Sequence, residues 1–275
     1  MFDLLKQACE IATREGCQFA DARYLDISKQ RVVSRDHALS SCNDSEDCGF
    51  GVRVLYQGAW GFASSPSYIA AELEKVVALA MQIARASAKA LRADGVNWAP
   101  EPALKLSFKS ECARDPFAVS LEEKADLLVS ANEIMLQNES IMRAQGYLLF
   151  KRVQRWYVNT EGSELHSDVT SSESVIWAIA VGEDDFQERN WKAPSSNRGF
   201  DAYDRAEFLQ QAERVASQAE EKLSARISPE GEFDIVTDSE NLSLTIHESV
   251  GHATELDRVM GYEVSMAGSS FVTRD

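Results

Sequence analysis

Four stretches of the chain carry the residue patterns of helices. In residues 1–16 and 67–91, apolar positions recur three or four residues apart with charges between them, which predicts two amphipathic helices. A third helix is predicted over residues 120–137, because Ser120 is a good N-cap and Glu123 stands where it can complete a capping box. Residues 204–223, rich in alanine, glutamate and glutamine, predict a fourth.

Strands are predicted between these helices. Apolar and polar residues alternate over residues 49–65 on both sides of Gln57-Gly58, which indicates a hairpin that turns there. Two further strands are expected just before it, at residues 19–28 and 31–41. After the third helix we expect strands at 140–152, 153–170 and 171–185, with a turn at Glu161-Gly162, and a short strand FDIVTD at 233–238.

Some residues of these segments could belong either to a site or to the scaffold. The acidic run NDSEDCG at 43–49 only loosely resembles a calcium loop and lacks its later glutamate, so we interpret it as a solvated loop. Four aromatic residues on predicted strands are expected to pack in the core or on a sheet face rather than stack on a substrate: Trp60, Phe62, Trp156 and Trp177.

The order of elements predicts an α+β fold with antiparallel sheets and packed long helices. A polar, proline-containing stretch at 93–105 is typical of a linker. We therefore expect an N-terminal α+β segment at 1–98 and a middle α+β segment at 99–227. Residues 228–275 are expected to begin a third, mostly β domain that contains a helix with two histidines.

Composition narrows the class of protein. The chain has 275 residues and a net charge of −16, which argues against binding to nucleic acids or to anionic membranes. No segment resembles a signal peptide or a membrane span, so we expect a cytoplasmic protein. The five cysteines are odd in number and irregularly spaced, which favours reduced thiols over a disulfide framework.

The segment HESVGH holds two of the four histidines, His247 and His252, with Glu248 after the first. A helical residue advances by about 100°, so histidines five positions apart differ by about 140° and face different sides of a regular helix. A widened π-type turn, or a helix that loosens at Gly251, would let both bind one metal ion. Glu248 could then accept a proton from water at the metal.

The spacing alone leaves a plainer interpretation open. Two histidines beside a carboxylate can be surface or capping residues of a helix. The other two histidines, His37 on a predicted strand edge and His166 in a polar strand, are expected to have no role in a site.

Three segments together resemble the TldD/PmbA family of metalloproteases. HESVGH, preceded by DIVTDSENLSLTI and followed by ATELD, is similar to the HExxxH segment of that family. GVRVLYQGAWGFASS at 51–65, with ADARY at 20–24 before it, looks like the family's N-terminal block. YVNTEGSE at 157–164 is similar to a strand and turn in its middle region.

The resemblance implies a zinc-dependent peptidase that acts on unfolded or flexible peptides, in peptide maturation or antitoxin degradation. Members pair with a homologous subunit, as heterodimers or homodimers, and only one type of subunit carries HExxxH. This chain is similar to that TldD-type subunit. Carried over, His247 and His252 are zinc ligands and Glu248 is the catalytic general base.

The chain also departs from the family pattern. The family's third zinc ligand is a cysteine far downstream, a position this chain does not have, and all five cysteines precede HESVGH. Glu255 could substitute as a ligand or orient His252 from behind, and we favour the second role. We expect the chain to be a fragment with little or no turnover, whose broken domain exposes Ile246, Val250 and Val259.

A second interpretation comes from a different class of protein. In it the chain is a non-catalytic binding or regulatory module that docks a partner subunit or a peptide, and its histidines are vestigial. Stoichiometric zinc that is lost on His247→Ala would favour the peptidase. Partner binding that needs no metal would favour the module.

Overall fold

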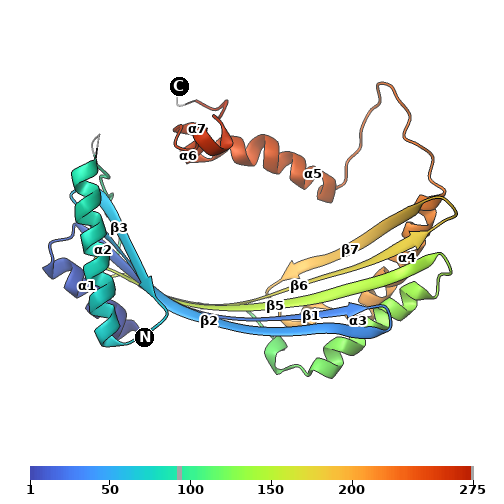
Figure 1. Cartoon of the computed structure of the whole chain (residues 1–275), viewed down its shortest axis with the longest axis horizontal. Helices are drawn as coiled ribbons and strands as arrows, with labels where there is room; N and C mark the ends of the chain where they lie inside the picture. The colour runs from blue at the N-terminus through green and yellow to red at the C-terminus, as the bar shows by residue number, and fades with distance from the viewer. Residues whose placement is uncertain (92–94, 274–275) are drawn as a thin grey trace. The chain divides into compact units, whose positions relative to one another are not determined.

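The chain forms two compact units, Met1–Ala225 and Arg226–Asp275, in a computed structural model that describes residues 1–91 and 95–273 (Figure 1). The first unit is a curved sheet with helices, and the second consists of short helices after an irregular segment. Strands from both sides of the predicted boundary at residue 98 join the one sheet. Residues 93 and 94 of the predicted linker lie outside the described residues.

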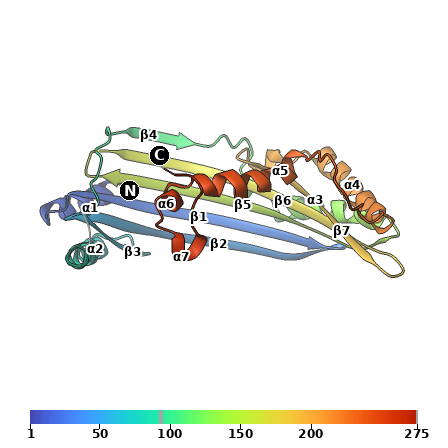
Figure 2. The same cartoon turned by 90° about the horizontal axis from the view of Figure 1, so that it is seen from above.

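Seven strands of the described residues form this sheet in the order β3-β2-β1-β5-β6-β4, and β7 also pairs with β6. All neighbours are antiparallel except β4 and β6, which are parallel. Figure 2 shows the four longest strands running side by side. The strands are β1 (Phe19–Arg35), β2 (Ala38–Tyr56), β3 (Ala59–Ser65), β4 (Lys105–Lys109), β5 (Ile141–Asn159), β6 (Glu164–Val181) and β7 (Phe186–Ser196).

The four helices predicted for the first unit are present. They are α1 (Phe2–Arg14), α2 (Ala70–Ala90), α3 (Leu121–Leu136) and α4 (Arg205–Leu223). The Ser120 hydroxyl accepts a hydrogen bond from the backbone N–H of Glu123 at 3.2 Å, as predicted. The Glu123 carboxylate instead binds the Arg114 guanidinium through two oxygens, so the predicted capping box does not close. The predicted α+β class with antiparallel strands and long helices is confirmed.

Two separate hydrophobic cores lie at opposite ends of the long strands, on the same face of the sheet. In β1, Ala22 belongs to the core under α1 and α2, whereas Val32 belongs to the core under α3 and α4. In β5, Val158 belongs to the core under α1 and α2, and Leu148 belongs to the core under α3 and α4. All four are even-numbered, and alternate residues of a strand point to opposite faces. Both helix pairs therefore cover one face, and no described helix of the first unit covers the other.

The predicted hairpin at Gln57-Gly58 joins β2 to β3. Both turn residues have positive φ, 47° and 77°, as a type I′ hairpin turn requires. Gly61 on β3 brings this hairpin close to α2, because a Cβ atom there would lie 2.0 Å from the carbonyl oxygen of Ala80. The residues of the hairpin thus fix the packing of α2 on the sheet.

The strands are longer than the sequence pattern predicts. The first hairpin runs through the acidic residues 43–49, which form part of β2 rather than the predicted loop, because each of them pairs with a residue of β1. The three strands predicted over 140–185 are the two long strands β5 and β6. Residues 186–196 form the unpredicted strand β7 at the sheet edge, and the FDIVTD segment is irregular rather than a strand.

The described residues of the second unit form three short α-helices, α5 (Ser239–Ile246), α6 (Leu256–Val259) and α7 (Val264–Ala267), with two further helical turns between α5 and α6. The exposed fractions of Ile246 and Val250 are 51% and 54%, in line with the expected exposure, whereas Val259 is partly covered. No helix among the described residues is both long and apolar enough to cross a membrane.

Candidate metal centre

The HESVGH segment continues directly from α5. This helix begins after Asp238, whose carboxylate accepts a hydrogen bond from the backbone N–H of Asn241 at 2.8 Å. At its end, residues His247–Gly251 form a π-helical turn, in which the N–H of His252 bonds to the carbonyl of His247. A 3₁₀ turn, His252–Thr254, follows. The chain therefore stays helical through the motif while its hydrogen bonding changes twice.

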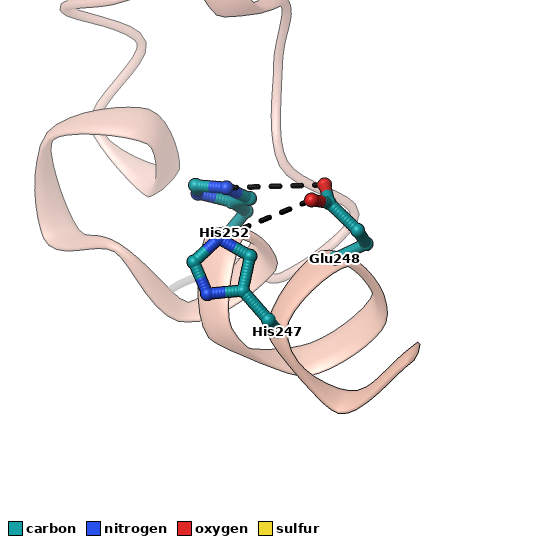
Figure 3. A group of neighbouring side chains, drawn as sticks. All are labelled: His247, Glu248 and His252. Atoms are coloured by element: carbon teal, nitrogen blue, oxygen red, sulfur yellow. Dashed lines mark ion pairs between the residues drawn. The ribbon is translucent and has the colours of Figure 1, made fainter. Parts of the chain in front are cut away.

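The π-turn solves the problem posed by the five-residue spacing. It places one more residue in the turn than an α-helix does, so residues five apart come onto the same side. The imidazole rings of His247 and His252 lie with their centroids 4.3 Å apart and their planes at 77° (Figure 3). Of the two distortions considered from the sequence, the widened turn is the one that forms.

Gly251 contributes less than the sequence suggested. Its φ and ψ angles, −55° and −59°, are those of any helical residue. A Cβ atom at this position would meet only the carbonyl oxygen of Ile246, at 3.9 Å. The conformational freedom of glycine is therefore not what brings the histidines together.

Glu248 lies between the two histidines. One carboxylate oxygen is 3.9 Å from Nε2 of His247 and the other is 3.8 Å from Nε2 of His252 (Figure 3). One ligand atom from each of the three residues can be chosen so that all three lie within 4.8 Å of one another. Two nitrogen ligands of a tetrahedral zinc ion are about 3.4 Å apart, a separation that falls within this range.

Glu255 contacts the far side of the second imidazole. Its Oε1 lies 2.9 Å from Nδ1 of His252, while Oε2 lies 3.6 Å from Nε of Arg258. A carboxylate accepts hydrogen bonds, so Nδ1 carries the ring proton and donates a hydrogen bond to Glu255, which leaves the lone pair of Nε2 free. Glu255 is thus placed to fix the tautomer and the orientation of the His252 ring.

One residue that sequence analysis missed supports the motif from further along the chain. The Ser270 hydroxyl donates a hydrogen bond to the carbonyl of Ala253, the residue after His252. The same hydroxyl accepts one from the N–H of Val272. No spacing rule connects a lone serine to a backbone carbonyl seventeen residues earlier, so the sequence carries no signal for this contact.

The remaining histidines and the cysteines belong to the first unit. His37 lies in the turn between β1 and β2 rather than on a strand edge. His166 packs against Trp156, with ring centroids 4.7 Å apart, and its Nδ1 is 3.2 Å from the Ser107 hydroxyl. All five cysteines are free thiols, and burial raises the pKa of Cys9 to about 12. A thiol of that kind is a poor ligand because it stays protonated.

Comparison with known proteins identifies the family. Residues 20–84 match the family description "PmbA/TldA metallopeptidase domain 1", and residues 114–223 match "PmbA/TldA metallopeptidase central domain". Together these matches cover more than half of the chain. The chain belongs to the TldD/PmbA metallopeptidase family. Both matched regions precede HESVGH, so they identify the family from its scaffold.

Individual relatives agree with this assignment. A metalloprotease of Methanothermobacter thermautotrophicus is 26% identical over 88% of this chain and 52% of its own length. A zinc metalloprotease TldD homolog of Saccharolobus solfataricus is 24% identical over 100% of this chain and 56% of its own. The chain thus spans about half the length of these relatives.

The fold itself recurs in a solved structure. A candidate modulator of DNA gyrase from Bacteroides thetaiotaomicron superposes with a TM-score of 0.72, covering 92% of this chain and 56% of that one. Sequence identity over the match is 18%, so the similarity concerns the fold alone.

Proposed function

We propose that the protein is the TldD-type, zinc-dependent subunit of a peptidase that cleaves unfolded or flexible peptides. The observation that carries the proposal is the π-turn, which brings His247, Glu248 and His252 within reach of one ion. A surface or capping role for the histidines would need no such turn. The family membership supplies the reaction class.

Each residue of the centre has a separate role in this proposal. His247 and His252 hold zinc through imidazole nitrogens, which suit that ion. Glu248 accepts a proton from the attacking water and passes it to the leaving amine. Glu255 orients His252. Bound zinc would supply Lewis-acid polarisation of the scissile carbonyl.

The ligand set in this chain is smaller than a catalytic zinc site usually has. Three protein ligands are typical, and the third ligand implied by the family resemblance is a downstream cysteine. The last cysteine of this chain is Cys112, which lies in the first unit. We therefore propose that the 275 residues bind zinc loosely and turn over little peptide, and that full activity requires a further ligand.

The proposal extends to partners and location. A peptide is the substrate, and a homologous subunit is the expected partner in a heterodimer or homodimer. The acidic net charge of −16 supports a protein that binds neither nucleic acid nor membrane by charge alone. A cytoplasmic location fits the free thiols.

Zinc stoichiometry tests the proposal directly. The 275-residue chain is dialysed against zinc, and bound metal is measured by elemental analysis alongside four histidine variants. We expect about one zinc per chain in the parent, in His37→Ala and in His166→Ala. We expect none in His247→Ala or His252→Ala. Zinc that survives both of the last two changes, or is absent from the parent, would overturn the proposal.

A second variant separates the ligands from the base. Glu248→Gln keeps the shape of the side chain but cannot accept a proton. It should retain zinc while abolishing whatever peptide hydrolysis the parent shows, measured with a quenched fluorescent peptide. Loss of zinc in this variant would make Glu248 a ligand instead.

A further inference from the structure

The face of the sheet opposite to α1, α2, α3 and α4 has an unusual charge distribution. On β1 its residues are Arg23, Leu25, Ile27, Lys29, Arg31, Val33 and Arg35. On the paired strand β5 they are Gln145, Tyr147, Leu149, Lys151, Val153, Arg155 and Tyr157. Over these ranges the two central strands present six cations, in a protein whose net charge is −16. We call this set of residues the basic face. The one acid of β1 on the same face, Asp21, is buried and bound by Arg53.

Contacts between side chains of β1 and β5 show that the residues of the basic face lie on the same side of the sheet. The guanidinium of Arg23 lies 5.2 Å from the centre of the Tyr157 ring, and that of Arg31 lies 4.8 Å from the centre of the Tyr147 ring. The Tyr147 ring in turn packs on Trp177 of β6. Cations held against aromatic rings keep their charge while losing freedom, so they are pre-ordered to meet an anion.

Most of these cations lack an acidic partner within the described residues. Only Arg23 is near a carboxylate, with its Nε 3.6 Å from Asp21, and that carboxylate is already bound by Arg53. Lys29, Arg31, Arg35, Lys151 and Arg155 form no ion pair there. On the flanking strands, the residues in register with the basic face add only two acids, Asp47 and Glu173. The surface is left electrostatically unneutralised.

The opposite face of the same strands has no such excess of cations. Its middle carries Asp26 on β1, Asp44 and Glu46 on β2, and Asp168 on β6, with Arg152 the one cation of β5 in the same rows. Charges of opposite sign are therefore sorted onto the two faces. Such sorting favours an acidic ligand on the basic face.

Apolar residues between the cations indicate what kind of acidic ligand fits. Leu25, Ile27, Val33, Leu149 and Val153 are all only partly covered. At one end lies a cavity of about 530 Å³, bounded by Leu25, Ile27 and Phe62, whose exposed fraction is 58%. Phe62 lies over Gly51, where a Cβ atom would be 2.9 Å from its ring. A polyphosphate backbone has no apolar groups to pack against these side chains, whereas a polypeptide can place apolar side chains there.

We propose that the basic face is a docking surface for an acidic, extended segment of a polypeptide, with an apolar side chain of that segment in the cavity beside Phe62. The stretch of β1 from Arg23 to Arg35 is about 40 Å long, enough for about twelve extended residues. The docking involves only the first unit and does not depend on zinc. Only the identification of this polypeptide as the substrate rests on the proposed peptidase function.

Fluorescence anisotropy of labelled peptides on the 275-residue chain tests the proposal. The probe is a peptide of about twelve residues with threonine at even positions and glutamate or valine at odd positions, so that the glutamates and valines of the extended peptide share one side. We expect it to bind at least tenfold more tightly than the same peptide with lysine for glutamate. Replacing its valines by serine should weaken binding at least threefold. Equal binding of the acidic and basic peptides would overturn the proposal.

Two double variants with the same change of charge locate the site. Lys29→Glu with Arg31→Glu alters the basic face, whereas Lys89→Glu with Arg214→Glu alters exposed positions on α2 and α4. We expect at least a tenfold loss of affinity in the first and less than a twofold loss in the second, with unchanged circular dichroism in both. Equal losses would mean long-range attraction to the whole molecule and would overturn the docking surface.

Two further measurements distinguish an acidic polypeptide from the two other possible occupants of the basic face, a nucleic acid and a second copy of the chain. An oligothymidine of similar length that competes as well as the acidic peptide would assign the face to nucleic acid and overturn the polypeptide. Sedimentation that shows self-association of the parent, abolished by Lys29→Glu with Arg31→Glu, would assign it to a second copy of the chain. Because no zinc is needed, failure here leaves the metal centre standing, and failure of the metal test leaves this result standing.

Discussion

Nδ1 of His252 lies 2.9 Å from Oε1 of Glu255, one helical turn further along the chain. The contact holds the side of the imidazole opposite to Nε2, and Nε2 faces Glu248. An acceptor behind a ligating histidine fixes its tautomer and raises its basicity. A short helical segment thus contains both a candidate ligand and the group that orients it.

This contact predicts the effect of changing Glu255. Glu255→Ala should weaken zinc binding about 10- to 100-fold, because the ring loses its acceptor. Glu255→Gln should weaken it less, since its carbonyl oxygen can still accept from Nδ1. Affinity is measured by competition with a chromophoric chelator. Asp257→Asn, at an exposed acid nearby, is the control, and an equal loss there would refute an orienting role for Glu255.

The backbone at Gly251 predicts that this glycine can be replaced. Gly251→Ala should preserve zinc binding, because the residue is already helical and a Cβ atom has room. The helical content should be unchanged, and stability should rise by as much as about 1 kcal/mol. Circular dichroism and zinc titration check both statements. Loss of zinc in this variant would show that glycine flexibility, rather than the π-turn, makes the site.

Gly61 and Gly182 form a matched pair for stability. A Cβ atom at Gly61 would lie 2.0 Å from the Ala80 carbonyl oxygen and 2.5 Å from the Ala84 nitrogen, both on α2. Gly61→Ala should cost about 3 kcal/mol or more, because α2 must move away from β3. At Gly182 the nearest atom is 3.6 Å away, so Gly182→Ala should change stability by less than about 0.5 kcal/mol. Urea unfolding compares them.

The Arg152–Asp168 pair predicts part of the acid sensitivity. Arg152 donates two hydrogen bonds to Asp168, at 2.8 and 2.6 Å, and lowers the pKa of that carboxyl below its usual 3.8. A lowered pKa means that the pair stabilises the fold above about pH 4, and that this contribution is lost as the pH falls through the lower, folded-state pKa. The native state should therefore lose stability on acidification through this pair.

Asp168→Asn removes the titration while keeping the shape. It should cost about 2 kcal/mol at pH 7, where the charged hydrogen bonds are lost. It should also flatten the fall in stability below about pH 4, measured by thermal unfolding at each pH. Glu10→Gln changes an exposed acid and serves as the control. A pH profile for Asp168→Asn parallel to that of the parent would contradict this account.

Helices and the short hairpin could be predicted from the sequence because their signals are local. The apolar spacing of α1 and α2 and the Ser120 cap depend on residues within a turn or two of one another. The hairpin at Gln57-Gly58 depends on two turn residues. These patterns survive in the folded protein because no distant contact opposes them.

The lengths of the strands could not be predicted, since they depend on pairing rather than on composition. Residues 43–48 are exposed and acidic, and nothing in them alternates. They extend because each pairs with β1, whose own middle is held by β5 on its other side. β7 escaped prediction for a similar reason, as a polar strand that pairs with β6.

In the candidate centre, the sequence left the geometry open. It showed that His247 and His252 cannot meet on a regular helix, and two distortions remained possible. Which one forms depends on backbone hydrogen bonding, and the N–H of His252 bonding to the carbonyl of His247 decides it. The role of Ser270 required the fold of residues after the motif.

The two hydrophobic cores share β1 and β5 as their continuous backbone but have no side chain in common. Between them the sheet is held by interstrand hydrogen bonds and by side-chain contacts such as Arg152–Asp168, and neither hydrophobic core of the first unit covers it. A layer of this kind resists stretching along the strands far more than it resists bending across them. The first unit therefore has two packed ends joined by a stretch of sheet that can bend. The curvature of the sheet can change while each core stays intact.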